Sequence, residues 1–265
     1  MNDLLIIIVL YNVKINQIEY LYDLEDFEVL IYDNSNTAQE CTNYHYFHDS
    51  SNPGVSKAYN YGITLAKQLN KKKVLILDQD TKFDKAALDQ YERLYAKYGN
   101  DYIYAPIIAG NDKIYSPYDE LKCRNKFQTS ESFAYNERYS LKNKAVINSG
   151  LMIPVSLAEK LGGFDENIKL DFSDSYFIEK YKWINEFIIL VNIKMEHSLS
   201  GDEGINKQKE LSRFRFYCSG ANYFYKKTKN KPRLLRMLFF RTFKLIIKYK
   251  SLGPVKIAIK CFKDN

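Results

Sequence analysis

Asp78 and Asp80 form an acidic pair, with one residue between them, directly after the apolar run Lys73–Leu77. Two carboxylates that project from one short loop supply the oxygen ligands that a hard divalent cation such as Mg²⁺ or Mn²⁺ prefers, and a bound diphosphate would complete its coordination shell. Acidic pairs after strands also occur in caps and turns, so the D-x-D spacing on its own leaves a purely structural role open.

Another carboxylate, that of Asp33, follows the apolar run Phe27–Tyr32. It could accept a hydrogen bond from the N3–H of a uracil or thymine ring. The alternative is that Asp33-Asn34-Ser35 forms an Asx turn or caps a helix.

Four acidic residues, Asp165, Glu166, Asp171 and Asp174, lie within ten positions of one another. A carboxylate in such a group can act as a general base that removes the proton from an acceptor hydroxyl. The alternative is that the acids compensate the positive end of the helix predicted to begin here.

Histidine and cysteine give weaker signals. His197 follows a predicted strand, and a histidine in a loop can bind a metal or a phosphate, although a single histidine more often has a structural role. The four cysteines are far apart and show no CxxC spacing, which excludes a zinc site and indicates free thiols in a reducing compartment. They are Cys41, Cys123, Cys218 and Cys261.

The elements that must position these residues alternate between strands and helices. Continuous apolar runs are typical of strands buried on both faces of a parallel sheet. In open α/β sheets ligands bind beyond the carboxyl ends of the strands, where the acidic residues lie. The predicted strands are Leu4–Tyr11, Phe27–Tyr32, Lys73–Leu77, Leu151–Val155 and Phe187–Ile193, and the predicted helices are residues 55–69, Asp84–Tyr98, Ser156–Leu161 with Ser156 as its cap, and Asp174–Lys182.

These elements predict a doubly wound α/β domain over residues 1–205. The chain has 265 residues, 46% of them hydrophobic, which is enough for one large core. Residues 106–145 are polar and irregular, and we expect either a flexible acceptor-side segment or a short antiparallel excursion. A basic, aromatic-rich helical tail is expected over residues 206–265, broken near Pro232 and Gly253-Pro254.

Positive charge is concentrated in this tail. Residues 222–265 contain 13 Lys or Arg and one acidic residue, a net charge of +12, which leaves −5 for the first 221 residues. A basic amphipathic helix lies well on an anionic bilayer, and the alternative is a helix packed on the catalytic domain with a solvated basic face. Nucleic acid is excluded as a partner because the apolar face is too large and the body is acidic. The sequence shows neither a signal peptide nor a membrane-spanning run, which predicts a cytoplasmic protein that can attach to the inner face of the cell membrane.

Taken in order, several short segments resemble glycosyltransferase family 2, in particular its bacterial rhamnosyltransferase-like branch. They span about three quarters of the chain, and the resemblance implies a GT-A fold, a Rossmann-like, mostly parallel sheet flanked by helices. The segments are Ile8-Val9-Leu10-Tyr11-Asn12, Asp33-Asn34-Ser35, Asn52-Pro53-Gly54 with Ala58 and Asn60-Tyr61-Gly62, Leu77-Asp78-Gln79-Asp80-Thr81, Asn148-Ser149-Gly150, Gly163-Phe164-Asp165-Glu166 through Asp174, and His197.

The resemblance implies a role for each of these residues. The base of a UDP- or dTDP-sugar would be bound by Asp33, and the donor also by Tyr11, Asn52, Gly54, Asn60 and Asp78. Mn²⁺ or Mg²⁺ would be bound by Asp80 and His197, and the saccharide acceptor, which a lipid could carry, would be contacted by Asp165. Asp174 would deprotonate the acceptor hydroxyl, which displaces the nucleoside diphosphate with inversion, as expected for polysaccharide synthesis.

Two departures from the family pattern leave alternatives open. The Glu of the catalytic "ED" pair is replaced by Ser173, and the acid expected two residues after the base is replaced by Tyr176. Either Asp174 is the base in a reduced motif, or Asp171 has this role. A non-catalytic homologue that binds a nucleotide sugar, or a related nucleotidyltransferase, are the competing functions. The nucleotidyltransferase lacks support, because such enzymes usually carry a glycine-rich loop after the first strand. The corresponding segment here, Tyr11-Asn12-Val13-Lys14, contains no glycine.

Overall fold

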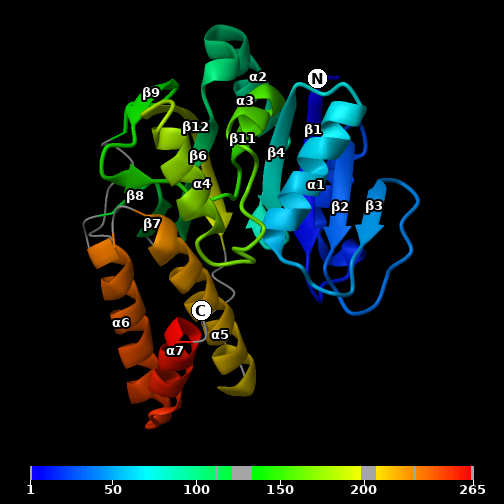
Figure 1. Cartoon of the computed structure of the whole chain (residues 1–265). Coiled ribbons are helices and arrows are strands. Elements are labelled where there is room, and N and C mark those ends of the chain that lie inside the picture. The colour runs from blue at the N-terminus through cyan, green and yellow to red at the C-terminus, as the bar shows by residue number, and fades with distance from the viewer. Residues whose placement is uncertain (1, 111–112, 121–132, 198–206, 229–230, 264–265) are drawn as a thin grey trace.

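The computed structural model describes residues 2–110, 113–120, 133–197, 207–228 and 231–263. Its centre is a mixed sheet in the order β3-β2-β1-β4-β11-β6-β12-β5 (Figure 1). The first four of these strands run parallel, and for β1, β2 and β4 the continuous apolar runs predict this arrangement. They are β1 (Leu4–Leu10), β2 (Glu28–Asp33), β3 (His45–His48) and β4 (Lys73–Asp78).

The second half of the sheet contains the antiparallel strands. Strand β11 runs antiparallel to β4 and β6, whereas β6 and β12 are parallel to each other. Strands β8 and β10 form a separate two-stranded sheet. The bounds are β5 (Thr81–Lys82), β6 (Tyr104–Gly110), β7 (Lys113–Ser116), β8 (Tyr118–Asp119), β9 (Glu137–Ser140), β10 (Lys144–Ala145), β11 (Met152–Pro154) and β12 (Phe187–His197).

Helices cover both faces of the sheet, so the predicted doubly wound α/β architecture is confirmed. Helices α1, α3 and α4 share one hydrophobic cluster with the sheet, and η2 and α2 share the cluster on the opposite face. The bounds are η1 (Ile15–Gln17), η2 (Glu19–Leu24), α1 (Val55–Gln68), α2 (Ala87–Tyr98), η3 (Gly99–Asp101), α3 (Val155–Lys160) and α4 (Ser173–Lys182).

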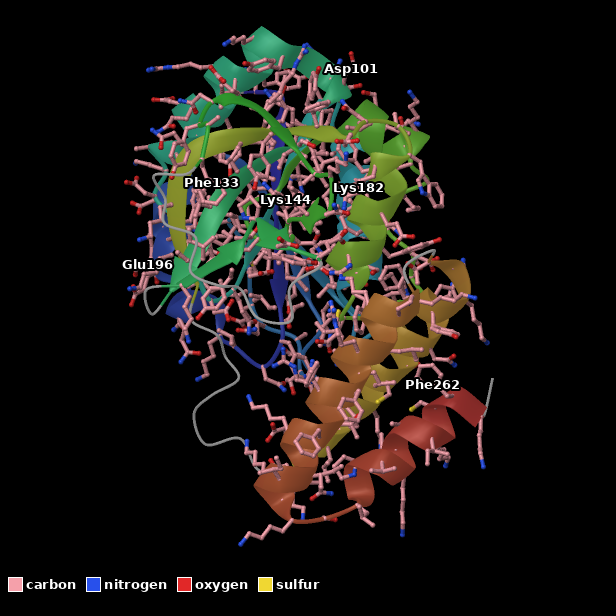
Figure 2. All side chains as sticks on the ribbon, turned by 90° about the vertical axis from the view of Figure 1, so that its left-hand side faces the viewer. Asp101, Phe133, Lys144, Lys182, Glu196 and Phe262 are labelled. Atoms are coloured by element: carbon pink, nitrogen blue, oxygen red, sulfur yellow. The ribbon has the colours of Figure 1, made fainter. Side chains whose placement is uncertain are left out.

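Three helices follow the sheet domain: α5 (Lys207–Lys227), α6 (Lys231–Tyr249) and α7 (Gly253–Lys263). Both views show them grouped at one end of the α/β body (Figures 1 and 2). They share a third hydrophobic cluster with the segment that leads into α4, because Phe172 and Tyr176 pack with side chains of α5 and α6. The cluster therefore crosses the predicted boundary at residue 205.

Several local predictions differ from the structure. Pro154, and not Ser156, precedes α3, so Ser156 lies inside the helix and caps nothing. Strand β3 and strand β6 were not predicted, and β6 occupies the start of the segment expected to be irregular. The remainder of that segment, where it is described, forms short strands, most of them antiparallel, which is the second of the two alternatives.

Candidate functional site

The carboxyl ends of β1, β2 and β4 bring three predicted residues to one edge of the sheet. Asp33 is in register with Leu10, and Asp78 with Val9. Directly after β1, the backbone N–H of Tyr11 donates to Oε1 of Gln79 at 2.8 Å. The ring of Tyr11 is half exposed beside this loop. The loop that contains the acidic pair is thus fastened to the end of the central strand.

The acidic pair itself lies above Tyr20 of η2. The Tyr20 hydroxyl donates to the backbone oxygen of Asp78 at 2.9 Å. Burial raises the pKa of Tyr20, and the charges of Asp78 and Asp80 raise it further. Both carboxylates therefore act electrostatically on Tyr20, and their joint binding of a cation stays a prediction.

His197 reaches the same loop through strand pairing. Strand β5 follows Asp80 directly and pairs antiparallel with β12, so that the backbone of His197 lies opposite Thr81. The side chain of His197 is outside the described part of the structure. Among the described side chains no group of three or more His, Cys, Asp or Glu converges to hold a metal. The two oxygen-bearing side chains suit Mg²⁺ or Mn²⁺ only if further ligands come from a bound diphosphate.

Asp33 is buried and occupied by hydrogen bonds from its own chain. Its oxygens accept from the N–H of Ser35 at 2.9 Å, from Gln39 at 3.0 Å and from the hydroxyl of Tyr46 at 2.9 Å. Burial has the largest influence and acts to raise the pKa of Asp33, but these hydrogen bonds outweigh it and hold the pKa below its ordinary value. The Asx-turn alternative is thus present in the fold, and the contact with a nucleobase stays a prediction.

Asn52 and Gly54 shape the turn before α1. Both have positive φ angles, of 47° and 104°. A Cβ atom at Gly54 would lie 2.2 Å from the backbone oxygen of Lys169, an oxygen that also accepts from the N–H of Val55. Glycine is therefore required at this position by a close approach within the chain, whether or not a donor binds beside it.

Asn60 has a structural role that the sequence did not indicate. Its amide accepts from the N–H of Phe164 at 2.8 Å and donates to the Phe164 oxygen and to Glu166, both at 2.9 Å. These bonds fasten α1 to the segment before α4. Direct contact between Asn60 and a donor stays a prediction.

Asp174, the predicted general base, lies in the first turn of α4. Burial raises its pKa to about 6; hydrogen bonds from Ser175 lower it, Asp171 raises it and Arg233 lowers it. A carboxyl group with a pKa close to neutrality is suited to proton transfer.

Tyr59 of α1 is a buried residue whose hydroxyl is influenced by the charges of both Asp174 and Asp78. The tyrosine is 2% exposed. Burial raises its pKa, and the charges of both Asp78 and Asp174 add to that rise. Asp78 and Asp174 therefore both act electrostatically on the same buried hydroxyl, although they are 96 positions apart in the chain.

Asp171, the alternative base, is engaged in an ion pair. Its Oδ1 lies 3.2 Å from Nη1 of Arg241, and its Oδ2 is buried with no hydrogen-bond partner among the described residues. Phe172, which separates it from α4, has a φ of 74°. A bulky residue in the left-handed region is strained, and such strain is concentrated at functional sites.

Asp165 is directed toward α5. It accepts from Asn167, from Tyr223 at 3.2 Å and from Lys227 at 3.2 Å. Burial acts to raise the pKa of Asp165, but Asn167 and Lys227 lower it below its ordinary value. The carboxylate thus anchors a C-terminal helix, and the predicted acceptor contact gains no support from its surroundings.

Two buried amide oxygens near the strand ends lack a partner. Within the described residues, Oδ1 of Asn34 and Oδ1 of Asn148 accept no hydrogen bond. Asn148 hydrogen-bonds Tyr59, and Ser149 contacts Thr81 with 2.6 Å between their hydroxyl oxygens. A buried acceptor without a donor is costly unless a ligand or water supplies one. The two oxygens are therefore unsatisfied acceptors within the described part of the chain.

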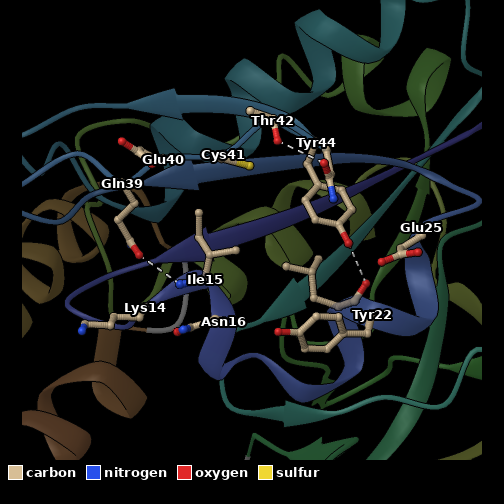
Figure 3. A pocket seen from close by; sticks show the side chains of 12 residues that line it. Lys14, Ile15, Asn16, Tyr22, Glu25, Gln39, Glu40, Cys41, Thr42 and Tyr44 are labelled. Carbon is tan, nitrogen blue, oxygen red and sulfur yellow. Dashed lines mark hydrogen bonds between the residues drawn. The ribbon is translucent and has the colours of Figure 1, made fainter.

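A cavity of about 360 Å³ opens between η1–η2 and the loop before β3 (Figure 3). Gln39 lines it and also hydrogen-bonds Asp33 and the backbone of Ile15. None of the predicted site residues lines this cavity. It adjoins the Asp33 end of the site, away from Asp174.

Comparisons with known proteins agree with the predicted resemblance. No family model matches the chain. It is 27% identical over 161 residues to dTDP-rhamnosyl transferase RfbF of Shigella flexneri, a match that covers 58% of this chain and 51% of that protein. The matched region thus spans about half of the relative's length.

Among solved structures the chain is similar to S. aureus TarS. TarS 1–349 gives a TM-score of 0.54 at 15% identity, with 98% of this chain and 89% of that chain covered. TarS 1–349 in complex with UDP-GlcNAc gives 0.55 at 14% identity, with 99% and 80% covered. The predicted GT-A fold, including the C-terminal helices, is therefore confirmed.

Proposed function

We propose that this chain, a protein of GT-A fold that resembles rhamnosyltransferase-type glycosyltransferases, transfers a hexosyl or rhamnosyl group from a nucleoside-diphosphate donor to a saccharide acceptor, in bacterial surface polysaccharide synthesis. The observation that carries the proposal is that Asp33 and Asp78 lie at the adjoining carboxyl ends of the parallel strands β1, β2 and β4 in a GT-A fold. An acidic loop at the strand ends and a carboxyl group of raised pKa, that of Asp174, are the two groups that such a transfer requires. The sequence similarity to a dTDP-rhamnosyl transferase supports it.

Asp174 is the general base of this proposal. With a pKa of about 6 it is mostly ionised at neutral pH and still basic enough to take a proton from an acceptor hydroxyl in the transition state. That hydroxyl oxygen forms the new bond to the anomeric carbon as the bond to the diphosphate breaks on the opposite side, which inverts the configuration. Asp171 is less suited because Arg241 already pairs with it.

The donor is held at the carboxyl ends of the parallel strands. Tyr11, Asp33, Asn34 and the acidic pair surround the ends of β1, β2 and β4. Asp78 and Asp80, with His197 across the β5–β12 pairing, would hold Mg²⁺ or Mn²⁺, which neutralises charge on the leaving diphosphate. UDP and dTDP are the nucleotides we propose, since a similar fold has been solved with UDP-GlcNAc and the sequence relative is named for dTDP.

The C-terminal helices provide a surface for an anionic membrane. Within the described residues no helix is both long enough and apolar enough to cross a bilayer. Helices α6 and α7 nevertheless expose large apolar side chains between lysines and arginines, and this combination suits a helix lying in an anionic interface. An acceptor carried by a lipid would be presented there. The exposed apolar residues of the two helices are Leu235, Phe239, Phe240, Phe243, Ile247 and Ile259, and Leu252 is exposed in the turn between them.

Donor binding tests this function directly. Isothermal titration of the full chain with UDP-, dTDP- and GDP-sugars, with and without Mn²⁺, should give binding of one uridine or thymidine donor that depends on the cation. Asp80→Ala should remove the dependence, and Asp84→Ala, which changes an acid beyond β5, is the matched control. Absence of binding for all three nucleotide classes would contradict the proposal.

A further inference from the structure

The C-terminal helix α6 contributes an arginine to the surroundings of Asp174. Arg233 is in the first turn of α6, with 10% of its side chain exposed, and its Nη1 lies 2.7 Å from Glu120. Lys182 of α4 pairs with the other Glu120 oxygen at 3.0 Å. Two cations and one anion thus form a cluster with a net positive charge, and this charge favours an ionised carboxylate nearby.

A series of polar contacts leads from Arg233 to Asp174. Nη2 of Arg233 lies 3.5 Å from the hydroxyl of Tyr118, which lies 3.1 Å from Oγ of Ser175. That Oγ lies 3.3 Å from Oδ1 of Asp174, to which the Ser175 N–H also donates at 2.6 Å. The first contact is long, so the guanidinium acts on Tyr118 mainly through its charge.

The chemistry of the two ends fixes the direction of this series. A guanidinium has only donors, and an ionised carboxylate has only acceptors. Tyr118 must therefore donate to Ser175, and Ser175 to Asp174, so that every hydroxyl proton points toward the carboxylate. Such aligned bonds polarise one another and hold the acceptor in place.

The charged and titratable groups around Asp174 come from four elements. Asp171 precedes it in the chain, and Tyr59 of α1, Tyr118 of β8 and Arg233 of α6 interact with it electrostatically. Asp171 opposes ionisation of Asp174, whereas Arg233 favours it. Burial raises the pKa of Tyr118 to about 12, so its hydroxyl stays protonated and can donate at neutral pH.

We propose that Arg233 is a positioning residue for Asp174, acting through Tyr118 and Ser175, so that the C-terminal helices complete the catalytic site. The inference rests on the proposed function only in calling Asp174 the base. The coupling between Arg233 and Asp174 is a property of the fold and is measurable without substrate.

The test is a carboxyl-carbon NMR titration of the full chain labelled with ¹³C-aspartate, with the Asp174 signal assigned by its loss in Asp174→Asn. Arg233→Gln should raise the pKa of Asp174 measurably, because it removes a positive charge that favours the ionised carboxylate. Tyr118→Phe keeps the ring and removes the hydroxyl, and should raise it by less. Lys244→Gln removes an exposed charge from the same helix and should leave it unchanged.

The proposal is overturned if the pKa of Asp174 in both Arg233→Gln and Tyr118→Phe is the same as in the parent chain. If Arg233→Gln fails to fold, as thermal unfolding would show, Tyr118→Phe alone decides. In transfer assays Arg233→Gln should lower kcat with little change in the KM for the donor. Full transfer by Asp174→Asn would contradict the proposed function, while the titration would still decide on the coupling.

Discussion

Arg241 of α6 lies 3.2 Å from Asp171, three residues before the proposed base. This ion pair distinguishes Asp171 from Asp174, the two carboxylates that the sequence left open as candidates for the general base. We predict that Asp174→Asn lowers kcat by about 10²-fold or more, the usual contribution of a general base, with little change in donor affinity. Asp171→Asn, its matched neighbour, should retain most of the activity. A dead Asp171→Asn variant beside an active Asp174→Asn variant would reverse the assignment.

The raised pKa of Asp174 also predicts the pH dependence of turnover. A base works only when it is deprotonated, so kcat should fall about tenfold per pH unit below its pKa of about 6. Initial rates from pH 4.5 to 8 at saturating donor and acceptor would show this acid limb. A profile that is flat down to pH 5 would exclude Asp174 as the base.

The same shift makes a prediction for stability. A carboxyl whose folded pKa lies above its unfolded value of 3.8 favours the folded state when protonated, and this stability is lost as pH rises from about 4 to about 6. Asp174→Asn should therefore raise the free energy of unfolding at pH 7 by up to about 3 kcal/mol. Urea unfolding at pH 4 and pH 7 tests this, because the difference between variant and parent should be small at pH 4.

A substitution of Gly54 should destabilise the folded protein without changing its charge. Gly54→Ala should lower the free energy of unfolding by about 3 kcal/mol, since the added carbon meets the Lys169 backbone in addition to straining φ. Gly99→Ala is the matched control: its φ is 74°, but nothing lies within 4 Å of the added carbon, so the strain alone remains. Equal losses for the two variants would contradict the close contact.

The exposed apolar side chains of α6 predict membrane binding. Phe239→Ser with Phe243→Ser should reduce sedimentation with phosphatidylglycerol vesicles, and binding by the parent should weaken as salt rises. Trp183→Ser, which changes an exposed aromatic outside the C-terminal helices, is the control. Point variants are preferable to truncation near Lys231, because Leu234 and Leu245 belong to the cluster shared with Phe172. Vesicle binding by the double variant equal to that of the parent would exclude this face.

The features predicted correctly from the sequence depend on local patterns, whereas the features that were missed depend on contacts between residues far apart in the chain. Strands β1, β2 and β4 were predicted because each is a continuous apolar run, and Asp33 and Asp78 were predicted at the ends of two of them. Strand β6 was missed because Pro106 interrupts a ladder that needs backbone N–H donors. Tyr59 and Arg233 were missed as site residues because only tertiary packing brings them to Asp174.

The contacts between α1 and the segment before α4 have a mechanical consequence. Gly54 and Val55 contact the backbone of Lys169, and the side chain of Asn60 hydrogen-bonds the backbone of Phe164. Two stretches that are far apart in the sequence are therefore held together. These contacts hold α1, which carries Tyr59, against the segment that leads into α4, which carries Asp174. We therefore expect the two helices to move as one unit when a substrate binds.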